Sequence, residues 1–287
     1  MLNVPKMIQL SQSKLNTWTM CERKFQLRYV EHHEWPAEPF PVESTEAMEL
    51  GEVFHMLAAQ KIMMGSQFEA PSNRLEPPLN VWWGNFLEKG PLIKDPERSN
   101  GRYRVESSLS AQINKDVKLI GRVDLLINGK ESIELFDWKT GRPRPKADLE
   151  QDWQSRIYLA LLYRSRQVIC NRAVTAEQIS MTYWYVSQPE ASVTIRFNEE
   201  WHRKNWEDLV ILANQVTNRL NGSQEIWPLT ANVEMCGRCS FNVICGREPA
   251  ADLFKANGNQ SADIEELADI EELSAIHSAE INVHPDI

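Results

Sequence analysis

Four of the five cysteines stand near the two ends of the chain. Cys21 lies near the start, and Cys236, Cys239 and Cys245 lie near the end as C-x2-C-x5-C, so Cys21 and Cys236 are 215 positions apart. Four soft thiolates in one cage can hold an iron–sulfur cluster or a structural zinc ion. If one site gathers them, the fold must bring the two ends of the chain together. Cys170 is then the odd cysteine, and we expect it to be a small buried apolar residue.

The composition predicts a soluble globular protein. The chain has 287 residues, of which 42% are hydrophobic and ten are tryptophan, enough to build a sizeable core. No stretch approaches the ~18 consecutive apolar residues of a membrane span, and the first residues lack the pattern of a signal peptide. An odd number of cysteines with one C-x2-C pair fits a reducing compartment. We therefore expect a cytoplasmic protein without a membrane partner.

The formal charge of −9 belongs almost entirely to the end of the chain. Residues 251–287 hold nine acidic residues and one lysine, which leaves 30 basic and 31 acidic residues in 1–250, a net of −1. We predict one folded domain over 1–250 and an acidic, mobile tail over 251–287, with a short amphipathic partner helix as the alternative for the tail. The neutral body permits local basic patches, although such runs are equally typical of a solvated surface. Two are visible: Arg142, Arg144 and Lys146, and Arg164 with Arg166.

Helical periodicity dominates the first hundred residues. Ser11 can cap a helix that runs to about Val30, with Cys21 on or beside it. A second helix is predicted over Thr45–Met64, and a shorter one over Leu79–Glu88 follows a loop at Pro71–Pro78.

From Arg102 the apolar period changes toward two, which predicts strands at Arg102–Ile113, Val117–Ile127 and Ser132–Lys139. The last two should pair as an antiparallel hairpin. A two-residue turn at Asn128–Gly129 would set Asp124 opposite Ile133, whereas a longer loop centred on Lys130 and Glu131 would set Asp124 opposite Asp137. The sequence leaves both registers open.

The rest of the body reads as alternating elements. A helix is predicted over Lys146–Arg166, strands over Ile179–Val186 and Ser192–Phe197, and a long helix over Asn198–Leu220.

Two carboxylates and a lysine lie on the predicted hairpin. Asp137 and Lys139 are two apart in D-W-K, so they project from the same face of a strand, and Trp138 faces the other way. Together with Asp124 they suit a hard divalent cation such as Mg²⁺ or Mn²⁺, which prefers oxygen ligands and can activate a water molecule. Alone, D-x-K is also the pattern of an ordinary solvated strand.

The order of the motifs is more specific than any one of them. The first motif is G-x3-H, which ends at His55. Glu106 comes next, followed by G-x2-D and then by D-x-K-T-G. The last motif, Q-x3-Y, places Gln154 and Tyr158 on one face of a helix. The cysteines lie outside all of these motifs.

This order, over about residues 11–248, resembles the RecB-type branch of the PD-(D/E)XK nucleases. The enclosing cysteines resemble its iron–sulfur members, the CRISPR-associated adaptation exonucleases and the AddB subunits. Val123 stands where the family name has proline. The resemblance implies a restriction-endonuclease-like α/β core, with a mixed central sheet flanked by helices and a four-cysteine clasp that joins the two ends.

The resemblance also implies residue roles. His55, Asp124 and Asp137 would bind the catalytic Mg²⁺ or Mn²⁺ together with the backbone carbonyl of Trp138, and Lys139 would be the catalytic lysine. The remaining roles concern the helix motif, the preceding strand and the cluster. Gln154 and Tyr158 would position DNA and the active site, Glu106 would be the acidic residue of the preceding strand, and Cys21, Cys236, Cys239 and Cys245 would hold a [4Fe-4S] cluster, with Zn²⁺ as the rival.

The implied function is that of a metal-dependent DNA exonuclease, acting on single strands or duplex ends in DNA repair, recombination or CRISPR adaptation, with DNA and an adaptation or recombination protein as partners. No G-x4-G-K-[ST] helicase motif occurs in the chain. The alternative is a catalytically silent DNA-binding scaffold subunit. The complete motif set argues against it, because DNA binding alone does not need all of these chemical groups together.

Overall fold

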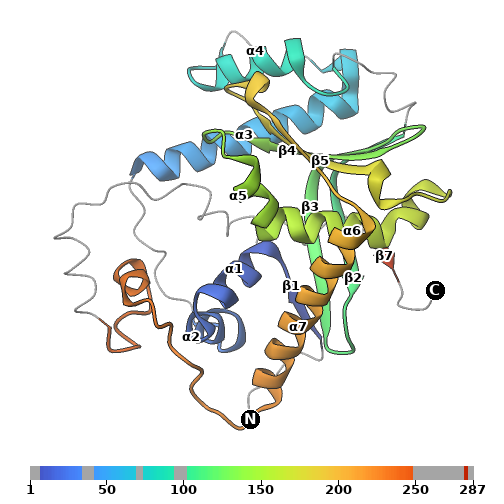
Figure 1. Ribbon diagram of the computed structural model, residues 1–287. Helices are drawn as coiled ribbons and strands as arrows, with labels where there is room; N and C mark the ends of the chain where they lie inside the picture. Colours follow the sequence, from blue (N-terminus) through green and yellow to red (C-terminus); the bar gives the residue numbers. More distant parts are fainter. Residues whose placement is uncertain (1–6, 34–41, 69–73, 94–101, 248–280, 284–287) are drawn as a thin grey trace.

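The computed structural model describes residues 7–33, 42–68, 74–93, 102–247 and 281–283. They form a mixed β-sheet with helices on both faces (Figure 1), which confirms the predicted α/β class. The strands are β1 (Ile8–Leu10), β2 (Tyr103–Gln112), β3 (Val117–Asn128), β4 (Ile133–Lys139), β5 (Ile179–Tyr185), β6 (Val193–Arg196) and β7 (Ile281–Val283). The α-helices are α1 (Gln12–Met20), α2 (Glu22–Phe25), α3 (Val42–Met64), α4 (Leu79–Lys89), α5 (Lys146–Gln151), α6 (Trp153–Cys170) and α7 (Glu199–Asn221).

The sheet has the order β6-β5-β4-β3-β2-β7, and β1 pairs with the first residues of β3. Strands β2, β3 and β4 form an antiparallel meander, whereas β5 runs parallel to β4. A parallel neighbour needs a crossover connection, and α5 and α6 supply it. The central strands therefore combine both pairing modes.

The β3–β4 hairpin uses the longer of the two loops that the sequence left open. Leu125 pairs with Phe136 and Asn128 pairs with Ile133. Continued by one residue, this register sets Asp124 opposite Asp137. The two-residue turn at Asn128–Gly129 does not form.

The two faces of the sheet carry different cores because side chains alternate along each strand. Leu126 and Leu135 face a cluster shared with α1, α6 and α7. Leu125, Phe136 and Trp138 face an aromatic cluster shared with α3 and α4. Trp138 thus points away from Asp137 and Lys139, as the strand period predicts.

Two helices predicted to be continuous are broken. The stretch from Ser11 to Val30 is interrupted at Cys21, whose backbone is extended (φ −162°, ψ 113°), and continues as α2 and a π-helical turn at Gln26–Val30. The helix over Lys146–Arg166 is interrupted at Asp152, which is also extended (ψ 139°). Periodicity missed both breaks because the apolar positions stay in phase across them. The Ser11 cap is confirmed, since its side chain accepts from the Lys14 amide.

The N-terminal helices pack against the segment that follows α7. The Gln26 side chain donates to the Glu225 carbonyl at 2.7 Å and accepts from the Trp227 amide at 2.8 Å. The Trp227 ring stacks on Phe25 and meets Trp18 edge-on. The two ends of the predicted domain are therefore in contact.

Part of the predicted loop at Pro71–Pro78 and most of the acidic tail lie outside the described residues. Within the tail, Ile281–Val283 pairs parallel with β2 as β7. None of the helices in the described ranges combines the length and apolarity needed to cross a bilayer.

Candidate active site

The site lies where the β3–β4 ladder ends. Pairing stops at Leu125 and Phe136, and beyond it the Trp138 amide donates to Oδ2 of Asp124 at 2.6 Å in place of a strand carbonyl. Asp124 and Asp137 are only 5% and 6% exposed. Because a buried carboxylate is costly without partners, each must be held by its neighbours.

Asp137, Lys139 and Gln154 form a closed group across β4 and α6. The Gln154 amide donates to Oδ1 of Asp137 at 2.6 Å, and Nζ of Lys139 donates to Oε1 of Gln154 at 2.9 Å. Nζ of Lys139 also lies 3.1 Å from Oδ2 of Asp137, although that buried oxygen accepts no hydrogen bond in the described structure. Gln154 thus fixes both the carboxylate and the lysine.

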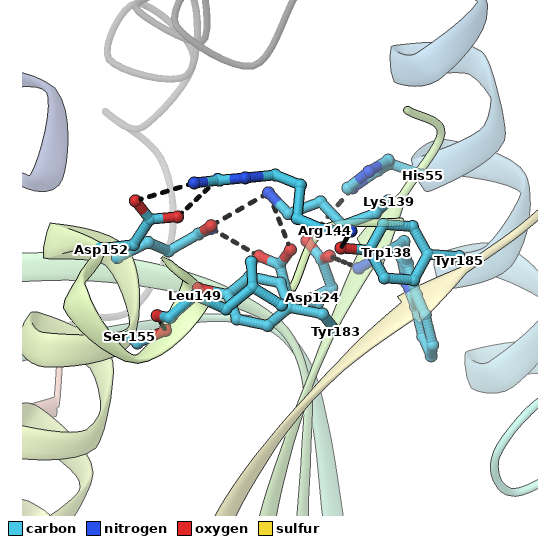
Figure 2. Close-up of polar contacts among 12 residues, drawn as sticks. His55, Asp124, Trp138, Lys139, Arg144, Leu149, Asp152, Ser155, Tyr183 and Tyr185 are labelled. Carbon is cyan, nitrogen blue, oxygen red and sulfur yellow. Dashed lines mark hydrogen bonds and ion pairs between the residues drawn. The ribbon is translucent and has the colours of Figure 1, made fainter. Parts of the chain in front are cut away.

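His55 approaches the same place from α3. Its Nδ1 lies 3.1 Å from Oδ1 of Asp124, and Figure 2 shows the ring directed at the strand ends. Glu106 arrives from β2, where its φ of 50° interrupts the pairing with β3 opposite Asp124. A non-glycine residue in this region is strained, and such strain is common at functional sites.

His55, Glu106 and Asp124 can hold a metal ion. One ligand atom from each residue lies within 4.8 Å of those of the others. The donor set of carboxylate oxygens with one imidazole fits a hard divalent cation. Oδ2 of Asp137, which forms an ion pair with Lys139, adds a further buried oxygen to the site. The residues present therefore fit a divalent metal.

Burial and crowded carboxylates shift three pKa values. The pKa of Glu106 rises to about 7, because burial disfavours its charged form and Asp124 repels a second negative charge. The pKa of Asp137 rises to about 6, mainly through burial, while Lys139 opposes the rise. Burial lowers the pKa of His55, but the neighbouring carboxylates, above all Asp124, outweigh it and raise that pKa to about 9. Such an excess of buried negative charge favours a bound cation.

A model of the PD-(D/E)XK nuclease superfamily matches residues 9–246. The chain belongs to this superfamily. Its members are hydrolytic nucleases that use divalent metal ions, in agreement with the donor set of His55, Glu106 and Asp124. The match spans every motif from G-x3-H to Q-x3-Y and ends just beyond Cys245.

Among solved structures, the chain is similar to SSO0001 at 18% identity and a TM-score of 0.37, with 86% of this chain and 90% of that chain covered. It is also similar to a proposed exonuclease from Eubacterium rectale at 11% identity and a TM-score of 0.45, with 94% of each chain covered. A comparison with curated proteins gives no significant match.

Tyr158 stands apart from the polar group of this superfamily site. Its side chain is buried in the core on the α6 face of the sheet. A Cβ at Gly121 would lie 2.8 Å from its ring. The glycine of G-x2-D and the tyrosine of Q-x3-Y therefore meet, and Tyr158 can act on Asp124 and Gln154 by holding β3 and α6 at a fixed separation.

Sequence reasoning missed several neighbours of the site. Tyr183 in β5 is the register partner of Asp137, and its ring lies 5.4 Å from Nζ of Lys139. Its hydroxyl lies 2.7 Å from Oγ of Ser155, and burial raises the pKa of the phenol. Only the β4–β5 pairing could have revealed this contact, and no motif records it.

Three of the cysteines, Cys21, Cys236 and Cys245, lie near one another at the junction of the two chain ends. Cys21 occupies the break between α1 and α2, where its Sγ accepts from the Lys24 amide at 3.5 Å. Burial raises the pKa of Cys245, a hydrogen bond from Arg23 opposes this, and Cys21 and Cys236 add to the rise, so these thiols are neighbours. All five cysteines are thiols rather than disulfides.

Proposed function

We propose that the protein is a Mg²⁺- or Mn²⁺-dependent DNA exonuclease that hydrolyses phosphodiester bonds in single strands or at duplex ends. The observation that carries this proposal is the convergence of two groups at the end of the β3–β4 ladder. Asp137, Lys139 and Gln154 form one group, and the possible ligands His55, Glu106 and Asp124 form the other. On an ordinary solvated strand face, Asp124, Asp137 and Gln154 would be exposed rather than buried.

The residues of the site would have different roles in the reaction. Asp124 and Asp137 would supply oxygens for the metal, with His55 and the Trp138 carbonyl as further ligands, and Glu106 would offer another carboxylate oxygen from β2. A bound divalent metal would screen phosphate charge and lower the pKa of a water molecule. Lys139, held by Gln154, would orient the attacking water or stabilise charge on the phosphate.

Tyr158 and Gln154 are proposed to position the site rather than to react. Gln154 does so through its two hydrogen bonds. Tyr158 does so through its contact with the Gly121 backbone. Small displacements of a reacting group are costly in rate, so such support contributes to catalysis.

We infer a [4Fe-4S] cluster at Cys21, Cys236, Cys239 and Cys245, with Zn²⁺ as the rival. Four thiolates suit either metal, and the resemblance to the iron–sulfur members of the family is what favours the cluster. The cluster would join the N-terminal helices to the C-terminal turns.

The resemblance to adaptation exonucleases and AddB subunits supports a role in DNA repair, recombination or CRISPR adaptation, with a partner protein from such a complex. It also supports DNA as the substrate over other phosphodiesters. These assignments follow the motif order and the enclosing cysteines.

The test is digestion of end-labelled single-stranded and duplex DNA by anaerobically purified protein, with and without Mn²⁺. Lys139→Ala should abolish shortening, and Lys204→Ala, at an exposed lysine of α7, should leave it unchanged. Intact DNA under all conditions, together with retained DNA binding, would replace this proposal with the silent scaffold.

A further inference from the structure

The loop that follows the catalytic lysine is built to hold one arginine. It reads Gly-Arg-Pro-Arg-Pro over residues 141–145, between β4 and α5. Pro143 and Pro145 fix φ on either side of Arg144. The Arg144 amide donates to the Tyr185 hydroxyl at 3.0 Å. The backbone of this residue is therefore anchored to β5.

The Arg144 side chain is held as firmly as its backbone. Its two terminal nitrogens donate to the two oxygens of Asp152, at 2.6 Å and 3.4 Å. Asp152 occupies the break between α5 and α6, at the N-cap position of α6, but makes no capping hydrogen bond. An aspartate at this position ordinarily accepts from first-turn amides. Here the carboxylate serves Arg144 instead.

This pair adjoins the catalytic group. Asp152 precedes Gln154 by two residues, and Gln154 binds both Lys139 and Asp137. Figure 2 shows the Arg144 side chain extending alongside Lys139 toward Asp152. Both side chains of the pair are 32% exposed. An ion pair with such exposure contributes little to the free energy of unfolding. Its main effect is to fix the position of the guanidinium.

We propose that Arg144 binds a backbone phosphate of the DNA strand beside the scissile bond, and that Asp152 is its positioning residue. This inference rests on the proposed function. The carboxylates of Glu106, Asp124 and Asp137 repel a polyanion, so the strand must be held by positive charge at the edge of the site. A guanidinium carries five N–H donors and binds carboxylates and phosphates alike, so Arg144 can bridge Asp152 and a phosphate group.

Binding to a labelled single strand tests the contact. All variants are made in a Lys139→Ala background with Mn²⁺, so that the strand is not consumed, and Kd is measured over a range of salt. Arg144→Gln should weaken binding about tenfold and reduce the slope of log K against log salt by about 0.7, the value for one lost phosphate contact on a single strand. Arg144→Lys should keep the slope and recover part of the affinity, because charge is retained without the fork.

Matched variants separate a specific contact from general charge. Arg142→Gln removes an exposed arginine from the same loop, and Arg203→Gln breaks an exposed pair with Glu207 on α7. Both should change Kd less than twofold. An effect of Arg142→Gln as large as that of Arg144→Gln, or an unchanged slope in Arg144→Gln, would overturn the proposal. Thermal melts confirm that each variant is folded.

Turnover with the native Lys139 tests Asp152. Asp152→Asn should retain the salt slope and lower kcat/KM several-fold, because the guanidinium loses its alignment. An unchanged kcat/KM would remove Asp152 from the proposal. If wild-type protein degrades DNA while Arg144→Gln binds it equally well, this inference fails alone. If wild-type protein neither binds nor degrades DNA, the proposed function fails with it.

Discussion

The active site and the cysteine region are assembled by different kinds of contact. In the active site, side chains from two strands and two long helices hold one another directly, as Gln154 holds Asp137 and Lys139. In the cysteine region, backbone bonds link near neighbours, such as the Cys239 amide to the Cys236 carbonyl and the Cys245 amide to the Phe241 carbonyl. Strand register therefore orders the first region over long sequence distances. In the second region, turns order the cysteines locally, and contacts such as that of Gln26 with Glu225 and Trp227 join the two chain ends next to them. A bound cluster would add a second link between the same two ends.

The sharpest test of this difference removes one ligand from the active site. Asp124→Asn keeps the size of the side chain and its contact with the Trp138 amide while removing its charge. We expect metal-dependent DNA degradation to fall about 10³-fold or more, with little change in Tm. Asp208→Asn, on an exposed carboxylate paired with Arg156, is the control. Full activity in Asp124→Asn would remove Asp124 from the ligand set.

The second test addresses the cysteine region. Cys21→Ser and Cys239→Ser should each lose the bound metal and lower Tm by several degrees, because the link between the two chain ends depends on all four ligands. Cys170→Ser, distant in sequence from both ends, should keep the metal. Iron and zinc contents, measured beside the melts, identify the metal. Unchanged content in Cys21→Ser would rule out the four-ligand model.

A third test probes the packing that supports the active site. Gly121→Ala places a Cβ 2.8 Å from the Tyr158 ring. Overpacking of this kind costs about 1–3 kcal/mol of unfolding free energy, and displacement of β3 should lower kcat as well. Gly84→Ala, whose Cβ meets nothing within 4 Å in α4, should stabilise the protein by roughly 0.5–1 kcal/mol. Chemical denaturation compares the two, and equal stabilities would refute the packing role of Tyr158.

The smallest effect is expected from α7, which precedes the cysteine turns and does not enter the catalytic group. His202 is buried against Tyr163 and Phe197, and burial lowers its pKa to about 4. As the pH falls, the imidazole is protonated in the unfolded chain before it is protonated in the folded protein. The neutral buried His202 therefore contributes its full stabilisation above pH ~6.5, and this stabilisation is lost as the pH falls toward 4.

Tm measured between pH 7.5 and pH 4.5 checks this for the wild type and His202→Phe. The variant should show the weaker pH dependence, because it has no imidazole to protonate. If Tm depends equally on pH in the two proteins, protonation of His202 does not destabilise the packing of α7.

The elements that sequence reasoning predicted well are those with a strong period and a clear boundary. The strands around Asp124 and Asp137, the helix that carries His55 and the Ser11 cap all follow from local patterns. The breaks at Cys21 and Asp152 did not, because the apolar positions stay in phase across both of them. Asp152 accepts a hydrogen bond from Arg144 instead of capping α6, and no local sequence pattern predicts this pairing.

The sequence by itself determined most helices and strands and the order of the motifs, because periodicity and residue chemistry are local properties. The α/β class followed from the family that the motif order resembles. Tertiary structure alone decided the hairpin register, since two loops of similar local quality set Asp124 opposite either Ile133 or Asp137. It also brought Tyr183 beside Lys139, Tyr158 against Gly121 and Arg144 to Asp152. Such contacts join residues that are far apart or on different elements, and the packing of the whole sheet selects them.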